Sequence, residues 1–132
     1  MKNNAIFITV TSIRNANTKK KALTRIPNTK MAKSIVQILL QEGLLSDITE
    51  HMEGGNSFLD VRLKYFGKRK EPCITTIQYI SKPGLRIYSD WSGIPKILGG
   101  IGIAILSTSR GVITDREARR KKIGGEILCH IW

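Results

Sequence analysis

The chain has 132 residues and a formal net charge of +12, from 22 Lys and Arg against 10 Asp and Glu. Its length predicts one domain or two small modules, and its 41% hydrophobic content is enough for a core. The charge indicates a polyanionic partner, usually nucleic acid. An anionic membrane is the alternative, but the longest apolar run, residues 97–106, is too short to span a bilayer and contains three glycines. We therefore expect no membrane partner.

The first half of the chain is predicted to contain two helices and three strands. Ile6, Val10 and Ile13 follow helical spacing, although the β-branched residues around them also favour a strand. Gly54, Gly55 and Asn56 separate two strand patterns and predict a hairpin. The predicted order is α-β-α-β-β: a helix at 3–16, a strand at 22–26, a helix at 31–39 capped by Asn28 or Thr29 and stopped at Gly43, and strands at 44–53 and 57–66.

A polar, charged segment between a glycine and a proline, residues 67–72, is the best candidate for a boundary. It predicts an N-terminal α/β module at 1–66, a linker at 67–72 and a C-terminal module at 73–132. Residues 1–70 carry 13 basic and 5 acidic groups (+8), and residues 71–132 carry 9 and 5 (+4). Both halves are basic, so a binding face could extend over both.

The second half is predicted to be mainly antiparallel β with short helices, which gives an α+β fold class for the whole chain. Residues 73–80 predict a strand, residues 82–84 a type II turn, and residues 85–88 the returning strand. Residues 91–93 are expected to form a loop, and Pro95 to begin a short helix that ends at Gly99.

The last third of the chain has the most consistent local signals. Ile101, Ile103 and Ile105 alternate with small residues and predict a buried strand, which continues into a turn at residues 107–111. Val112 and Ile113 are expected to form the partner strand. A capping box of Thr114 and Glu117 then begins a helix with a basic end, Gly124 and Gly125 end it, and residues 126–132 form a final strand.

Three consecutive hydroxyl residues in that turn, residues 107–109, are the main chemical feature. Ser and Thr both donate and accept hydrogen bonds, so they can contact base edges, 2′-hydroxyls and phosphates. The alternative is an ordinary hairpin turn, where these residues are common.

No catalytic or metal-binding pattern accompanies the hydroxyls. Ser109 lacks a GxSxG context, His51 and His130 lack an evident orienting carboxylate, and there is no dinucleotide or phosphate-binding loop. Cys73 and Cys129 form no CxxC pair, and their spacing with the histidines does not fit a zinc site. We expect no enzyme activity, no cofactor, no metal, no small-molecule substrate and a reducing compartment. Because RNP-type, KH-type and zinc-finger motifs are also missing, the residues alone predict a basic α+β protein that binds nucleic acid.

Several motifs resemble the small-subunit ribosomal protein eight family of bacteria and plastids. They are residues 107–111, 81–88, 94–102, 114–119, 124–128, 12–15 and 41–43, so the likeness covers essentially the whole chain. The sequences at 35–40 and 127–132 resemble the chloroplast branch. No transit peptide is apparent, which a plastid-encoded gene would explain, and the expected location is the chloroplast stroma.

The resemblance implies a primary ribosomal RNA-binding protein that grips a helix in the central domain of small-subunit RNA and helps to build the platform. It also implies contacts with small-subunit proteins five and twelve. The RNA-binding positions that it implies are Ser107, Thr108, Ser109, Arg110, Tyr88, Gly124, Gly125 and Glu126, with a further contact at Lys30. The alternative is a non-ribosomal basic RNA-binding or regulatory module.

Hydroxyl side chains suit duplex RNA, whose shallow minor groove displays 2′-hydroxyls, while Lys and Arg supply non-specific attraction. Gly124 and Gly125 could let the backbone approach RNA closely. Glu126 could accept hydrogen bonds from bases or hold the hydroxyls of residues 107–109. Alternatively, it is a charge on a strand edge that discourages pairing between sheets.

Overall fold

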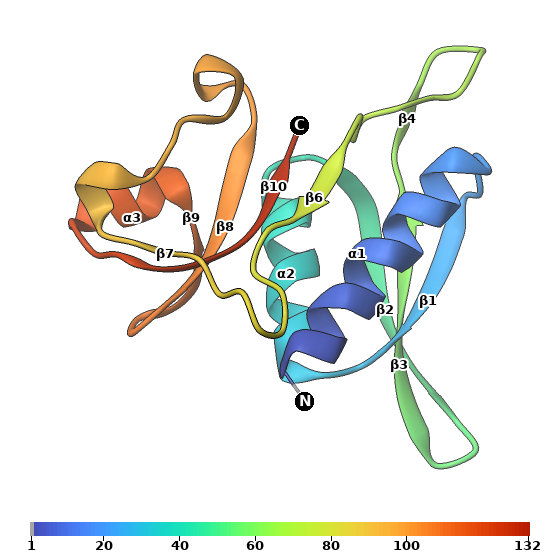
Figure 1. Cartoon of the computed structure of the whole chain (residues 1–132). Helices are drawn as coiled ribbons and strands as arrows, with labels where there is room; N and C mark the ends of the chain where they lie inside the picture. Colours follow the sequence, from blue (N-terminus) through green and yellow to red (C-terminus); the bar gives the residue numbers. More distant parts are fainter. Residues whose placement is uncertain (1) are drawn as a thin grey trace. The chain divides into compact units, whose positions relative to one another are not determined.

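The computed structural model describes residues 2–132, and the elements of the chain confirm the α+β fold class (Figure 1). The chain divides into two compact units, one ending at Thr75 and one beginning at Thr76. The proposed module boundary at residues 67–72 stays a prediction. In the structure this segment supplies the turn and second strand of a small hairpin, β4 (Tyr65–Phe66) paired with β5 (Glu71–Pro72), within the first unit.

The first unit has the predicted α-β-α-β-β order. Its central strand is β3, which pairs antiparallel with β1 on one side and β2 on the other. The two helices contact each other, and α1 packs against β1 while α2 packs against β2 (Figure 1). The elements are α1 (Lys2–Thr18), β1 (Leu23–Pro27), α2 (Lys30–Gln41), β2 (Leu45–Glu53) and β3 (Asn56–Leu63).

Burial explains why residues 3–16 form a helix despite their β-branched side chains. Ile6, Val10 and Ile13 are all buried, and only a helix places residues with this spacing on one face. Thr29 caps α2 by accepting a hydrogen bond from Ala32 N at 3.1 Å, as predicted. Tertiary packing therefore overrides the local β propensity.

The second unit is an antiparallel sheet in which β10 is central. On one side β10 pairs with β8, which pairs in turn with β9, and on the other side it pairs with β6 and β7. Its elements are β6 (Ile77–Tyr79), β7 (Tyr88–Ser89), β8 (Ile103–Thr108), β9 (Gly111–Thr114), α3 (Asp115–Lys121) and β10 (Gly125–Ile131), with two 3-10 turns, Trp91–Gly93 and Ile97–Gly100.

A buried carboxylate fixes α3 on the sheet of this unit. Asp115 accepts a hydrogen bond from Ala104 N at 3.1 Å and forms an ion pair with Arg119 at 2.8 Å. Ala118, on the same helix, packs into the aliphatic core with Leu106 and Ile127. Because a buried charge is costly unless it is paired and hydrogen-bonded, these contacts specify where α3 sits.

The predicted pairing of residues 73–80 with residues 85–88 is wrong. The strands are shorter, Ile77–Tyr79 and Tyr88–Ser89, and each pairs with β10 instead. The buried Ser81 hydroxyl takes the backbone N–H of Ile87 at 3.0 Å, which removes that donor from a strand ladder. The type II turn between these segments is confirmed, because Leu85 N donates to Lys82 O and Gly84 has φ +83°.

Four smaller expectations also need correction. Ile101 is 84% exposed and precedes β8. Residues 91–93 form a 3-10 turn because the Asp90 carboxylate accepts from Gly93 N at 3.0 Å. Pro95 starts no helix; the 3-10 turn begins at Ile97 and bends through left-handed residues. Helix α3 ends at Lys121 with Lys122 left-handed, so Gly124 and Gly125 do not end it.

Candidate nucleic-acid interface

The turn between β8 and β9 is held by one of its three hydroxyls. Thr108 Oγ1 donates to Gly111 O at 2.8 Å and accepts from Arg110 N at 3.1 Å. Gly111 has φ +101°, a conformation that favours glycine, and Ser109 and Arg110 occupy the exposed tip. The Thr108 hydroxyl therefore has the ordinary role of a turn hydroxyl, which is to hold the turn together.

The other two hydroxyls are not used in this way. Within the described part of the chain, neither Ser107 nor Ser109 makes a side-chain hydrogen bond, and Ser109 is exposed while Ser107 is half-buried. A hydroxyl on a rigid turn without an internal partner can donate to a ligand and accept from it. Two hydrogen-bonding groups are thus presented together on a fixed backbone.

Strand register places three of the predicted residues in one row across the sheet. Glu126 on β10 lies opposite Ser107 on β8 and opposite Tyr88 on β7. Residues directly opposite each other in antiparallel strands project from the same face. We call these residues the Tyr88–Glu126–Ser107 row. Tyr88, at one end of the row, is 68% exposed, so its ring is accessible to a ligand.

Gly124 and Gly125 are required by close contacts inside the unit. A Cβ atom on Gly125 would lie 2.2 Å from Ser107 O, and one on Gly124 would lie 2.3 Å from Ser89 O. Both distances are far below any normal contact. The two glycines therefore allow β8 and the end of β7 to approach the start of β10 from its two sides, which brings the members of the row together.

Glu126 is the buried centre of the row, with 6% of its surface exposed. Arg86 approaches its Oε2 atom to 3.6 Å, and that oxygen is buried without a hydrogen bond among the described residues. Burial raises the pKa of Tyr79. The Arg86 charge opposes this shift, and the Glu126 charge adds to it. Because β10 is central rather than an edge strand, the strand-edge interpretation of Glu126 is wrong.

A family model described as "Ribosomal protein S8" matches residues 4–132. The chain belongs to the ribosomal protein S8 family. It is 73% identical to the small ribosomal subunit protein uS8c of Adiantum capillus-veneris and 58% identical to that of Physcomitrium patens, over 132 residues and the full length of both chains in each case. It is 52% identical over 130 residues to the small ribosomal subunit protein uS8 of Gloeothece citriformis, covering 98% of each chain. These are ribosomal proteins and not enzymes.

Against this family background, the structure groups eight of the nine predicted positions in the second unit: residues 88, 107–110 and 124–126. Lys30 is separate. It is exposed at the first position of α2, in the first unit. These eight positions, on the sheet of the second unit and its β8–β9 turn, form the candidate surface, and Lys30 lies in the other unit.

Two residues close in sequence to Tyr88, namely Arg86 and Trp91, were not predicted from the sequence. Arg86 lies beside the Glu126 carboxylate, and Trp91 is partly exposed with the Lys122 ammonium 5.8 Å from the centre of its ring. Arg86 could have been identified from its position two residues before Tyr88, because residues two apart on an extended segment share a face. Trp91 had no such signal, since its position depends on the Asp90 turn.

His130 is half-buried. Burial lowers its pKa, against the opposing effect of Asp115, and its Nε2 atom is buried without a hydrogen bond among the described residues.

Over the described residues, no group of three or more His, Cys, Asp and Glu side chains is arranged to hold a metal ion. No helix in that part of the chain has the length and apolarity needed to cross a membrane.

Proposed function

We propose that this chain is a structural protein of the chloroplast small ribosomal subunit and binds small-subunit ribosomal RNA through the Tyr88–Glu126–Ser107 row and the adjoining turn. Family membership and the names of the relatives support the ribosomal and chloroplast assignments. They favour this function over a non-ribosomal RNA-binding module. The net charge of +12 supports a polyanionic ligand.

The observation that carries the RNA-binding proposal is the pairing of Glu126 with both Ser107 and Tyr88. This register puts an exposed aromatic ring at one end of a row and a hydroxyl without an internal partner at the other. Proteins commonly recognise RNA by stacking unpaired bases on aromatic rings and by hydrogen-bonding 2′-hydroxyls and base edges. The row offers both kinds of contact on one rigid sheet.

Each residue of the surface then has a distinct role. Ser107 and Ser109 hydrogen-bond the RNA, Tyr88 stacks on a base or ribose, and the exposed Arg110 contacts a phosphate. Thr108 holds the turn through its two hydrogen bonds. Gly124 and Gly125 hold the strands close enough for the row to form.

Glu126 acts as a positioning residue in this proposal. Its Oε2 atom is covered by protein, so RNA cannot reach that oxygen directly. Its ion pair with Arg86 holds that guanidinium near Tyr88, and its buried charge lies between Ser107 on one strand and Tyr88 on the other. Arg86 partly balances its charge from the solvent side.

The RNA is a helix in the central domain, and its binding helps to assemble the platform. The neighbouring proteins are small-subunit proteins five and twelve. Lys30 contributes a phosphate contact from the first unit, where it is exposed at the start of α2.

Footprinting of the full chain on small-subunit ribosomal RNA tests this function. We expect protection of one irregular helix in the central domain at protein concentrations that leave other segments unprotected. Uniform weak protection along the RNA would support the non-ribosomal alternative and overturn the proposal. A Tyr88→Ala variant should lose the specific protection, because it removes the stacking surface without removing charge.

A further inference from the structure

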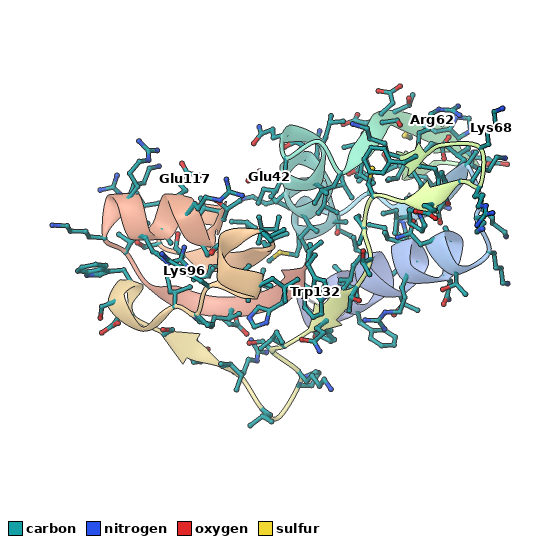
Figure 2. The ribbon with its side chains drawn as sticks, turned by 90° about the horizontal axis from the view of Figure 1, so that it is seen from above. Glu42, Arg62, Lys68, Lys96, Glu117 and Trp132 are labelled. Atoms are coloured by element: carbon teal, nitrogen blue, oxygen red, sulfur yellow. The ribbon has the colours of Figure 1, made fainter. Side chains whose placement is uncertain are left out.

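The first unit carries a cationic surface that has no role in the RNA contacts proposed above. Three consecutive lysines, residues 19–21, follow α1, and three consecutive basic residues, residues 68–70, form the β4–β5 turn. All six are exposed. Figure 2 shows Arg62 and Lys68 at the same end of this unit. Segments that are 49 residues apart in sequence thus bring their charges to one place.

Specific contacts hold the two segments together. Lys20 Nζ donates to Arg69 O at 3.0 Å, and the Tyr65 hydroxyl donates to Lys21 O at 2.5 Å. Burial raises the pKa of Tyr65, so its hydroxyl stays protonated and continues to donate. We call residues 19–21 the lysine loop. This loop is fixed to the β4–β5 hairpin because a side chain of each segment donates a hydrogen bond to a backbone oxygen of the other.

Two hollows flank the lysine loop, and alternate lysines line them. Lys19 and Lys21 line the first, and Lys20 lines the second. The first hollow also has hydroxyl and amide groups, and the second has two further cations. The other lining residues are Ser12, Asn15, Ala16 and Thr24 for the first hollow, and Ala22, Arg62, Leu63, Tyr65, Gly67 and Lys70 for the second.

The cations of this surface are not neutralised by carboxylates. Within the described chain, residues 19–21, 62 and 68–70 make no ion pair. By contrast, Arg25 pairs with Glu53 and Asp60, and Lys33 pairs with Glu50, on the sheet of the same unit. Unpaired like charges repel each other, so gathering them in one place favours an anionic ligand.

We propose that the two hollows bind phosphates of an RNA backbone, which gives the first unit RNA contacts in addition to the one proposed for Lys30. The ligand class, RNA, rests on the proposed function, but the site itself rests on the hollows and their unpaired cations. Two cationic side chains in one hollow, with hydroxyl and amide donors nearby, suit phosphate oxygens, because these oxygens accept several hydrogen bonds. A strand crossing the lysine loop would place phosphates over both hollows. The contact reads no base, so it adds affinity and orientation rather than sequence specificity.

The test compares three double variants of the full chain: Lys19→Gln/Lys21→Gln for the first hollow, Arg62→Gln/Lys70→Gln for the second, and Arg25→Gln/Lys33→Gln as the control. Each removes two positive charges from the first unit, but the control cations are already paired with carboxylates. Binding to small-subunit ribosomal RNA is measured over a series of salt concentrations, together with footprints at one concentration.

Each hollow variant should reduce the slope of log affinity against log salt by about 1.4 to 1.8, because two phosphate contacts are lost. Each should also lose protection of one RNA segment while keeping the protection that Tyr88→Ala removes. The control should change neither. Equal slopes in all three variants and the parent, or an equal reduction in all three, would overturn this inference and leave the proposed function intact. If the parent chain protects no specific segment, the proposed function fails instead.

Discussion

Replacing Gly125 with alanine tests whether the glycine is needed for packing inside the protein or for contact with RNA. The new methyl group would lie 2.2 Å from Ser107 O and 3.0 Å from Thr108 Cγ2, so β8 and β10 must move apart by about 1 Å. Overpacking of this kind costs about 1–3 kcal/mol in free energy of unfolding. With a urea m-value of about 2 kcal/mol/M, the unfolding midpoint should fall by about 0.5–1.5 M.

Urea unfolding followed by fluorescence or circular dichroism measures this shift, and Gly93→Ala is the control. A Cβ on Gly93 would lie 3.5 Å from Asp90 Oδ1, an ordinary contact, and 3.1 Å from Ser89 Oγ, whose side chain can rotate. Under conditions where both variants are folded, Gly125→Ala should bind specific RNA more weakly than Gly93→Ala, because Ser107 is displaced. If Gly125→Ala keeps the parental midpoint and still loses RNA binding, the glycine serves backbone approach to RNA and our reasoning is refuted.

Three further predictions follow from charge and burial. Affinity for small-subunit RNA should fall about a thousandfold between 50 and 200 mM salt if about six phosphates are contacted, and a salt-independent affinity measured by filter binding would contradict a backbone ligand. Glu126→Ala should weaken binding to specific RNA and leave binding to random RNA unchanged or stronger, whereas the exposed control Glu71→Ala should not separate the two affinities. Because burial lowers the pKa of His130, the unfolded chain takes up a proton near pH 6.5 that the folded chain resists, so stability should be complete above that pH and decrease below it. Urea midpoints measured at pH 7.5 and pH 5.5 should differ less for His130→Gln than for the parent, and an equal difference would exclude His130 as the cause.

The sequence predicted the elements of the first unit because local and tertiary signals agree there. The buried positions of α1 follow helical spacing, the Thr29 cap precedes α2, and the glycine turn separates β2 from β3. Each of these signals acts within a few residues of its effect. Strand order could be inferred only for the hairpin, because the pairing of β1 with β3 depends on contacts between distant segments.

In the second unit, the sequence could not reveal that β10 pairs with three strands. Residues 82–85 form the predicted turn, which suggested that the segments before and after it pair with each other. The Ser81 hydroxyl instead takes the Ile87 N–H, and Tyr88 reaches a different strand. A side-chain hydrogen bond of this kind leaves no periodic pattern in the sequence, so it is found only in the structure.

The predicted site residues stay a prediction, but the structure adds physical reasons that the sequence did not supply. Hydroxyl chemistry singled out residues 107–109, but the structure separates Thr108, which holds the turn, from the two serines. The glycines were expected to end a helix, yet in the structure they allow backbones to pack closely. Such contacts cannot be inferred from composition or spacing, because they join atoms from strands that only the fold brings together.

The proposed function depends above all on recognition of RNA by Ser107 and Ser109, and a Ser109→Ala variant tests this recognition. Affinities for the specific small-subunit RNA and for a random RNA of equal length are measured at one salt concentration, with Ser46→Ala, an exposed serine of the first unit, as the control. Losing a neutral hydrogen bond and orphaning its partner costs about 0.5–3 kcal/mol, so specific binding should weaken from several-fold to about a hundredfold. Binding to random RNA, the urea midpoint and the control should stay unchanged. If Ser109→Ala binds the specific RNA as tightly as the parent, residues 107–109 form an ordinary turn and Ser109 does not recognise RNA.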